Sequence, residues 1–232
     1  STGDWDWVER TVAEIRRDDL PEELRVTLEI PDAVIKALRG DPDTDDRIRA
    51  IEPLLGATTD PGIEAEFRWA QAWVAVAGGL WKEAFDRGFY QAGVAPSTSN
   101  EVCYLIASRA ALWSGDLRSA QNALGKIEAT SSHGTWIACS CDTLAAGVAA
   151  LEGRKEEAAT LYVSAIEVWR ALDTPFDLAM CGLDFAALVG VDNHQARVAA
   201  LEARAIFAEL GAKPFLERLE AALHSPSEVS AL

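Results

Sequence analysis

"GLWKEA" (79–84), "GDLRSA" (115–120) and "GRKEEA" (153–158) share one pattern, a glycine followed five residues later by an alanine. A fourth stretch, "GVDNHQA" (190–196), follows the same pattern with one extra residue. The last alanines of these stretches are 36, 38 and 38 residues apart. A period of this length is typical of a repeat built from a pair of helices.

A second alanine stands nine positions before the last alanine of each stretch. These residues are Ala75, Ala111, Ala149 and Ala187. Two antiparallel helices joined by a tight turn approach closely only where small side chains face each other. The pattern therefore predicts four helix hairpins with alanines at the contact and a glycine at each turn.

Apolar periodicity extends the helical prediction over nearly the whole chain. The predicted helices are 4–18, 22–38, 45–56, 61–77, 80–93, 98–113, 116–128, 136–152, 154–172, 176–189, 192–210 and 214–223. The stretch "RVTLEIP" (25–31) alternates like a strand, but without a partner strand we assign it to a helix. In "ARAIFAELGAKPFLERLEAAL" (203–223), Gly211 fits a left-handed C-cap and Pro214 fits a new helix start, so this stretch predicts a helix, a turn and a terminal capping helix.

The turn glycine, the alanine five residues later and the small residue nine before it resemble tetratricopeptide repeats, which usually have 34 residues. The resemblance covers about residues 61–211. It implies an all-α chain whose antiparallel helix hairpins stack into a right-handed superhelical solenoid. Residues 1–60 would then be an N-terminal cap or degenerate repeat, and 212–232 a capping helix and tail. Gly88 and Ala200 stand where other copies have a large residue, which predicts looser packing of the first and last copies.

The stretch 203–223 also resembles the last repeats of large bacterial regulators, namely LuxR-type signal-transduction ATPases and their cyclase-linked relatives. This resemblance implies a non-enzymatic interaction or ligand-sensing module inside a larger signalling or transcriptional regulator. The start "STGDWDW" and the single methionine, Met180, agree with a piece of a longer protein. Four sparse cysteines fit a reducing cytoplasm, where we expect the protein to reside.

Charge and hydropathy exclude two classes of partner. The 232 residues carry a formal charge of −16, which repels phosphate backbones, so we expect no direct binding of nucleic acid. The longest strongly apolar stretch, residues 72–81, is about half of the ~20 residues that a membrane span requires. We therefore expect a protein, a peptide or a small effector as the partner, with self-association as a further possibility.

Tryptophan and arginine mark the candidate binding residues, because tryptophan often anchors binding surfaces. Trp69 and Trp73 share a helix face that is rotated away from Ala75, and Arg109 is 36 residues after Trp73. In the family that the chain resembles, the first helix of each repeat lines a concave groove. The groove positions here are Trp69, Trp73, Leu105, Arg109, Trp113 and Thr143, with Gly147 beside them. Packing between neighbouring repeats is the alternative role for these side chains.

Two other clusters raise the question of a metal or an active site. In "DPDTDDRIRAIE" (41–52), acidic residues take positions 1, 3, 5 and 12 of a calcium loop, but Asp46 replaces the required glycine. We interpret this stretch as a solvated loop whose acids favour the next helix. The rival hypotheses to an interaction module are a metal-dependent enzyme using this loop and a purely structural spacer.

Cys139 and Cys141 are two residues apart on a predicted helix and cannot both bind one metal. We expect buried cysteines, no cofactor and no catalytic residues.

Overall fold

The computed structural model describes residues 4–15, 21–57, 60–94, 100–130 and 133–224. These residues form an all-helical protein without a strand, as predicted. Contacts divide the chain into an N-terminal unit, Asp4–Thr130, and a C-terminal unit that begins at Ser131. This division falls inside the segment 61–211, for which the sequence predicts the repeats.

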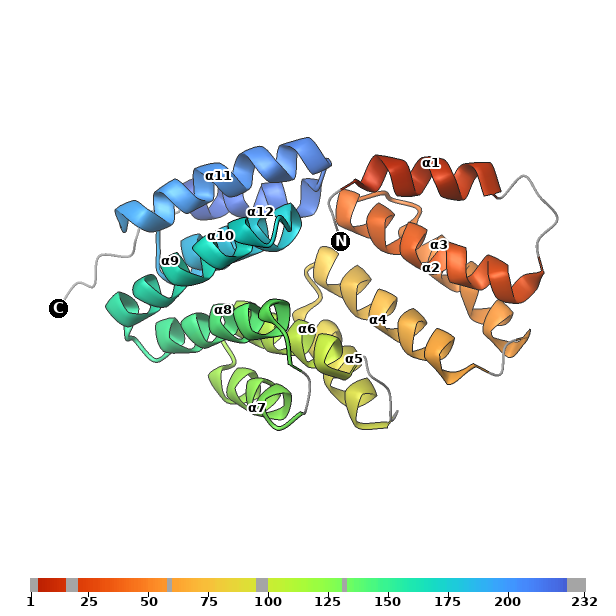
Figure 1. Cartoon of the computed structure of the whole chain (residues 1–232), viewed down its shortest axis with the longest axis horizontal. Helices are drawn as coiled ribbons and strands as arrows, with labels where there is room; N and C mark the ends of the chain where they lie inside the picture. Colours follow the sequence, from red (N-terminus) through yellow and green to blue (C-terminus); the bar gives the residue numbers. More distant parts are fainter. Residues whose placement is uncertain (1–3, 16–20, 58–59, 95–99, 131–132, 225–232) are drawn as a thin grey trace. The chain divides into compact units, whose positions relative to one another are not determined.

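The N-terminal unit contains seven α-helices and one 3₁₀ helix within its described residues (Figure 1). They are α1 (Trp5–Ile15), α2 (Glu22–Arg39), α3 (Thr44–Ile51), η1 (Glu52–Ala57), α4 (Pro61–Ala77), α5 (Trp81–Val94), α6 (Asn100–Trp113) and α7 (Leu117–Glu128). The C-terminal unit contains α8 (Thr135–Leu151), α9 (Lys155–Ala171), α10 (Pro175–Leu188), α11 (His194–Leu210) and α12 (Lys213–His224). The predicted helix 45–56 is thus an α-helix followed by a 3₁₀ turn.

The strand-like stretch 25–31 lies inside α2, so its assignment to a helix is confirmed. Val26, Ile30 and Val34 are all buried, and their spacing of four residues places them on one helix face. Packing of this face outweighs the local alternation and the interior Pro31. Arg39, near the end of α2, forms ion pairs with Asp6 and Glu9 of α1.

The three regular glycine turns have the same backbone hydrogen bonds. Gly79, Gly115 and Gly153 have φ of 73°, 76° and 82°, the left-handed region that favours glycine. In each turn, the amide nitrogen of the residue after the glycine donates to the carbonyl oxygen of an alanine. This alanine lies four residues before the glycine, and the nitrogen and oxygen are 2.9 Å apart. This is the 6→1 bond of a Schellman motif. The repeated glycine–alanine pattern therefore encodes a repeated turn, which folds α5 back on α4, α7 on α6 and α9 on α8.

The fourth turn corrects the predicted register by one residue. Ala187 is exposed, whereas its neighbour Ala186 is buried, as are Ala75, Ala111 and Ala149. The extra residue of "GVDNHQA" lies in the turn between α10 and α11, so the buried alanine lies ten residues before Ala196 instead of nine. The repeat copies are therefore aligned by the buried alanine before each turn and not by a fixed number of residues.

Gly88 and Ala200 do not mark loose packing. Gly88 is buried where α5 crosses α6, and a Cβ there would lie 2.7 Å from the carbonyl oxygen of Cys103. Gly182 of α10 is in an equally close crossing, because its Cβ would lie 2.8 Å from the carbonyl oxygen of Ala199 in α11. Ala200 is itself fully buried. Small residues at these places bring helix backbones together.

The terminal helix α12 covers α10 and α11, as expected for a cap. Phe215 and Leu219 of α12 are fully buried. The ring of Phe215 lies 5.5 Å from that of Phe176 in α10 and 5.7 Å from that of Phe207 in α11. Gly211, with φ of 69°, forms the predicted left-handed C-cap of α11.

Candidate binding surface

Four of the predicted binding residues lie on two helices of the N-terminal unit that pack against each other. Trp69 and Trp73 belong to α4, and Arg109 and Trp113 belong to α6. All four side chains are partly exposed. We call these four residues the α4–α6 set. They combine large apolar rings with a guanidinium group, which can bind a carboxylate through two parallel hydrogen bonds.

Packing already fixes part of the α4–α6 set. The ring of Trp113 meets Trp81 of α5 edge to face, with centroids 5.0 Å apart and planes at 84°. Arg109 and Trp73 also have contacts within the protein. Packing between helices, the alternative role predicted for these side chains, is therefore present at Trp113, and their role in binding stays a prediction.

The indole nitrogen of Trp69 is the polar atom in this set that lacks a hydrogen bond. It is buried, and the described residues offer it no acceptor. An unsatisfied buried donor costs about 1–3 kcal/mol.

Leu105 and Thr143 lie in the protein interior. Leu105 of α6 is buried, and Thr143 of α8 is fully buried in the C-terminal unit. The Thr143 hydroxyl donates to the carbonyl oxygen of Cys139 at 2.8 Å and accepts from the indole nitrogen of Trp169 at 3.0 Å. Gly147 is buried as well. These positions offer no surface to a ligand in this conformation.

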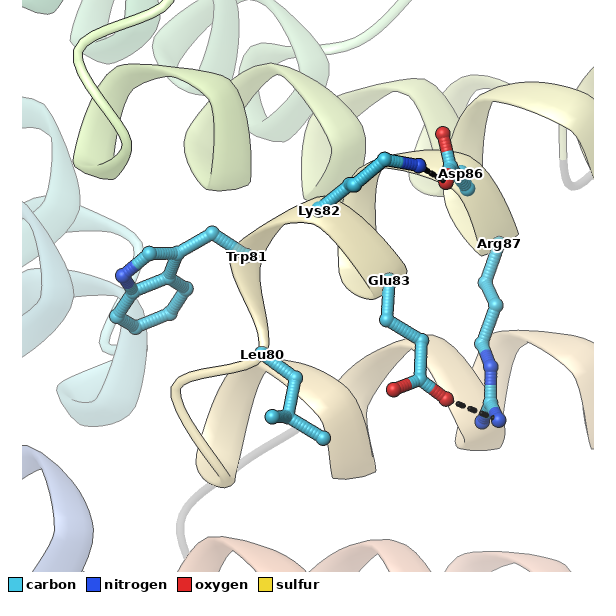
Figure 2. Close-up of a pocket in the computed structure, with 6 residues that line it drawn as sticks. All are labelled: Leu80, Trp81, Lys82, Glu83, Asp86 and Arg87. Carbon is cyan, nitrogen blue, oxygen red and sulfur yellow. Dashed lines mark hydrogen bonds and ion pairs between the residues drawn. The ribbon is translucent and has the colours of Figure 1, made fainter.

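Sequence reasoning missed an exposed face on α5. Leu80, just before this helix, is 55% exposed and Tyr90 is 70% exposed. An open hollow of about 370 Å³ lies at the start of α5 (Figure 2). It is lined by Leu80, Trp81, Lys82, Glu83, Asp86 and Arg87. The aromatic residues in "LWKEAFDRGFY" (80–90) could have indicated this face. The repeat pattern instead predicts binding residues on the first helix of each hairpin, and α5 is a second helix.

The aromatic side chains of α5 form a row along α6. Phe85 and Phe89 stack with centroids 5.1 Å apart, and Phe89 meets Tyr104 of α6 edge to face at 5.5 Å. With Trp81 against Trp113, this row spans the seam between the two helices. These rings therefore stiffen the N-terminal unit beside the α4–α6 set.

The acidic stretch 41–52 is a turn followed by a helix. Asp41 accepts a hydrogen bond from the amide of Asp43, and α3 begins at Thr44. Asp45 and Asp46 occupy the first turn of α3, where carboxylates favour the helix dipole. Among the described residues, no group of three or more histidine, cysteine or acidic side chains is placed to hold a metal.

The cysteines are free thiols, and Cys103, Cys139 and Cys181 are buried, while Cys141 is partly exposed. Burial, aided by the charge of Glu101, raises the pKa of Cys103 to about 11. Burial, aided by Asp142 and Asp177, raises the pKa of Cys139 to about 12. Thiolates are the nucleophilic form of cysteine, so these two residues are kept unreactive at neutral pH.

Comparisons of the chain with protein-family models, with curated proteins and with solved structures gave no match. Within the part of the chain that the structure describes, no helix is both long enough and apolar enough to cross a membrane.

Proposed function

We propose that this chain is a non-enzymatic interaction module built from tetratricopeptide-like hairpins, and that it binds a peptide or protein segment on the α4–α6 set. The observation that carries the proposal is that Trp69, Trp73, Arg109 and Trp113 keep part of their side chains exposed on two adjoining helices. Leu105 and Thr143, the repeat equivalents of Trp69, are buried. Exposed tryptophans next to an arginine have the composition of an interface hot spot.

The chemistry of the set favours a ligand with a carboxylate beside an apolar group. The guanidinium of Arg109 would bind the carboxylate of a peptide end or an acidic side chain, and the tryptophans would cover the apolar part. The chain as a whole is strongly acidic, so such a ligand would need this local positive charge to approach. The resemblance to bacterial regulators supports a sensor or scaffold role, in the cytoplasm, within a larger protein.

A peptide-display experiment tests the proposal. A random peptide library would be selected on the wild-type protein, and the affinity of an enriched peptide would be measured for Arg109→Ala and Trp73→Ala. We expect Arg109→Ala to weaken binding at least tenfold, about 1.4 kcal/mol, with nearly unchanged thermal stability.

Arg154→Ala is the matched control, because Arg154 is an exposed arginine of the C-terminal unit, paired with Glu152 and Glu157. It should leave the affinity unchanged. A large drop in melting temperature for Arg109→Ala, with normal affinity per folded molecule, would assign Arg109 and its neighbours to packing and remove the proposed binding surface.

A further inference from the structure

The exposed side of α5, with the residue just before this helix, contains a stripe whose positions are symmetric about residue number 85. Its members are Leu80, which precedes α5, and Glu83, Arg87 and Tyr90 of α5, at the helical spacing i, i+3, i+7 and i+10. Figure 2 shows Leu80, Glu83 and Arg87 projecting from the same side of the helix. We call these four residues the α5 stripe.

The α5 stripe is accessible. Leu80 and Tyr90 are more than half exposed, and the side chains of Glu83 and Arg87 are 43% and 35% exposed. Glu83 and Arg87 form an ion pair of 2.5 Å, and Arg87 also donates to the carbonyl oxygen of Gln71 in α4 at 3.1 Å. The stripe thus has an apolar residue at each end and one acid and one base between them.

This order is self-complementary for two antiparallel helices. When two copies of α5 run in opposite directions with the level of residue 85 on the two-fold axis, residues whose numbers add up to 170 lie opposite each other. Leu80 then faces Tyr90 of the other copy, and Glu83 faces Arg87. Each of these pairs occurs twice, as a two-fold symmetric interface requires.

Net charge also favours this segment for self-association. Residues 61–130 contain seven acidic and six basic side chains, a formal charge of −1, whereas the whole chain carries −16. The rest of the chain carries the other −15, and like charges across an interface are unfavourable. Helix α5 itself carries two acidic and two basic side chains, so its charges can pair with those of a second copy.

We propose that two copies of this chain associate through the α5 stripe, as an antiparallel helix pair whose two-fold axis passes at the level of residue 85. This surface is separate from the α4–α6 set and goes beyond the proposed function. One helix from each copy covers less than the about 800 Å² per partner of a standard interface, so the dimer is weak. It is expected to form at high concentration.

Sedimentation equilibrium from about 1 µM to about 1 mM protein tests the association. We expect the wild-type mass to rise towards that of a dimer. Leu80→Ser and Tyr90→Ser should each weaken the association at least tenfold. The control Val198→Ser removes a comparably exposed apolar side chain from α11 and should leave it unchanged. A wild-type protein that stays monomeric throughout this range would overturn the proposal.

Charge exchange tests the antiparallel register. Glu83→Arg places two bases in the stripe and Arg87→Glu places two acids, so each variant alone should remain monomeric. An equimolar mixture should recover a heterodimer, because the acids of one chain face the bases of the other. Variants that failed to fold could not recover on mixing.

The matched controls for this exchange are Glu157→Arg and Arg154→Glu, which alter an ion pair on α9 and should each leave the dimer intact. Loss of association in both single α5 variants without recovery in the mixture would rule out this register. Undiminished association in the single variants would rule out the stripe.

Discussion

Where α5 crosses α6, Gly88 lies so close to the backbone of Cys103 that a Cβ on the glycine would be 2.7 Å from the carbonyl oxygen. Backbone atoms at a packed crossing cannot move away cheaply. Gly88→Ala should therefore destabilise the protein by about 1–3 kcal/mol, the usual cost of overpacking, although alanine is the better helix former. Urea denaturation would measure the change.

Gly125→Ala is the control for Gly88→Ala. Gly125 is also helical, in α7, and its added Cβ would meet nothing within 4 Å. Helix propensity alone then acts, so this variant should be more stable than wild type by about 0.5–1 kcal/mol. Equal effects of the two substitutions would contradict the close crossing.

The terminal helix offers a second prediction. Leu219→Ala removes a fully buried side chain from the contact of α12 with α10 and α11, and should cost about 2–5 kcal/mol. Phe215→Ala should cost about 3–5 kcal/mol for the same reason. Leu201→Ala, at a position 52% exposed on α11, is the matched control and should have little effect. Thermal melting that did not distinguish Leu219→Ala from Leu201→Ala would mean that α12 does not stabilise the C-terminal unit.

The interior of the C-terminal unit gives a third prediction. Thr143→Val keeps the shape of the side chain but removes the acceptor for the indole nitrogen of Trp169. An unsatisfied buried donor costs about 1–3 kcal/mol, and stability should fall by that amount. Thr160→Val on the exposed side of α9 is the control, and it should be close to neutral. Because Thr143 is fully buried, its substitution should leave peptide affinity per folded molecule unchanged.

The buried thiols predict alkaline destabilisation. An unfolded cysteine loses its proton near its ordinary pKa of 9.0, whereas Cys139 in the folded protein holds it until about 12. Between these values the folded state binds more protons, so the free energy of unfolding falls as pH rises. Cys139→Ala should make the free energy of unfolding fall less steeply with pH, by the contribution of up to one proton. Denaturation between about pH 9 and 11 would measure this slope.

Local signals in the sequence were sufficient for the helices but insufficient for the candidate site. A turn glycine such as Gly115 and the alanine before it act within one hairpin, so their spacing predicts the turn directly. Thr143 is buried beside Trp169, which is 26 residues away in the sequence. Gly88 is small because α6 crosses it closely, and no local sequence pattern predicts that contact. The repeat register at Ala186 also depends on which alanine meets its partner helix. Repeat equivalence thus placed the candidate residues on the first helix of each hairpin, while the exposure of each position was set by contacts between helices.

The main helix contacts within each unit join helices that are neighbours or next but one along the chain. Such a topology has low contact order, and chains of this kind fold quickly from local contacts. During synthesis, each hairpin can close once its second helix has left the ribosome, before the rest of the chain exists. Newly exposed apolar faces are then covered in the order in which they are made, and α12 covers those of α10 and α11.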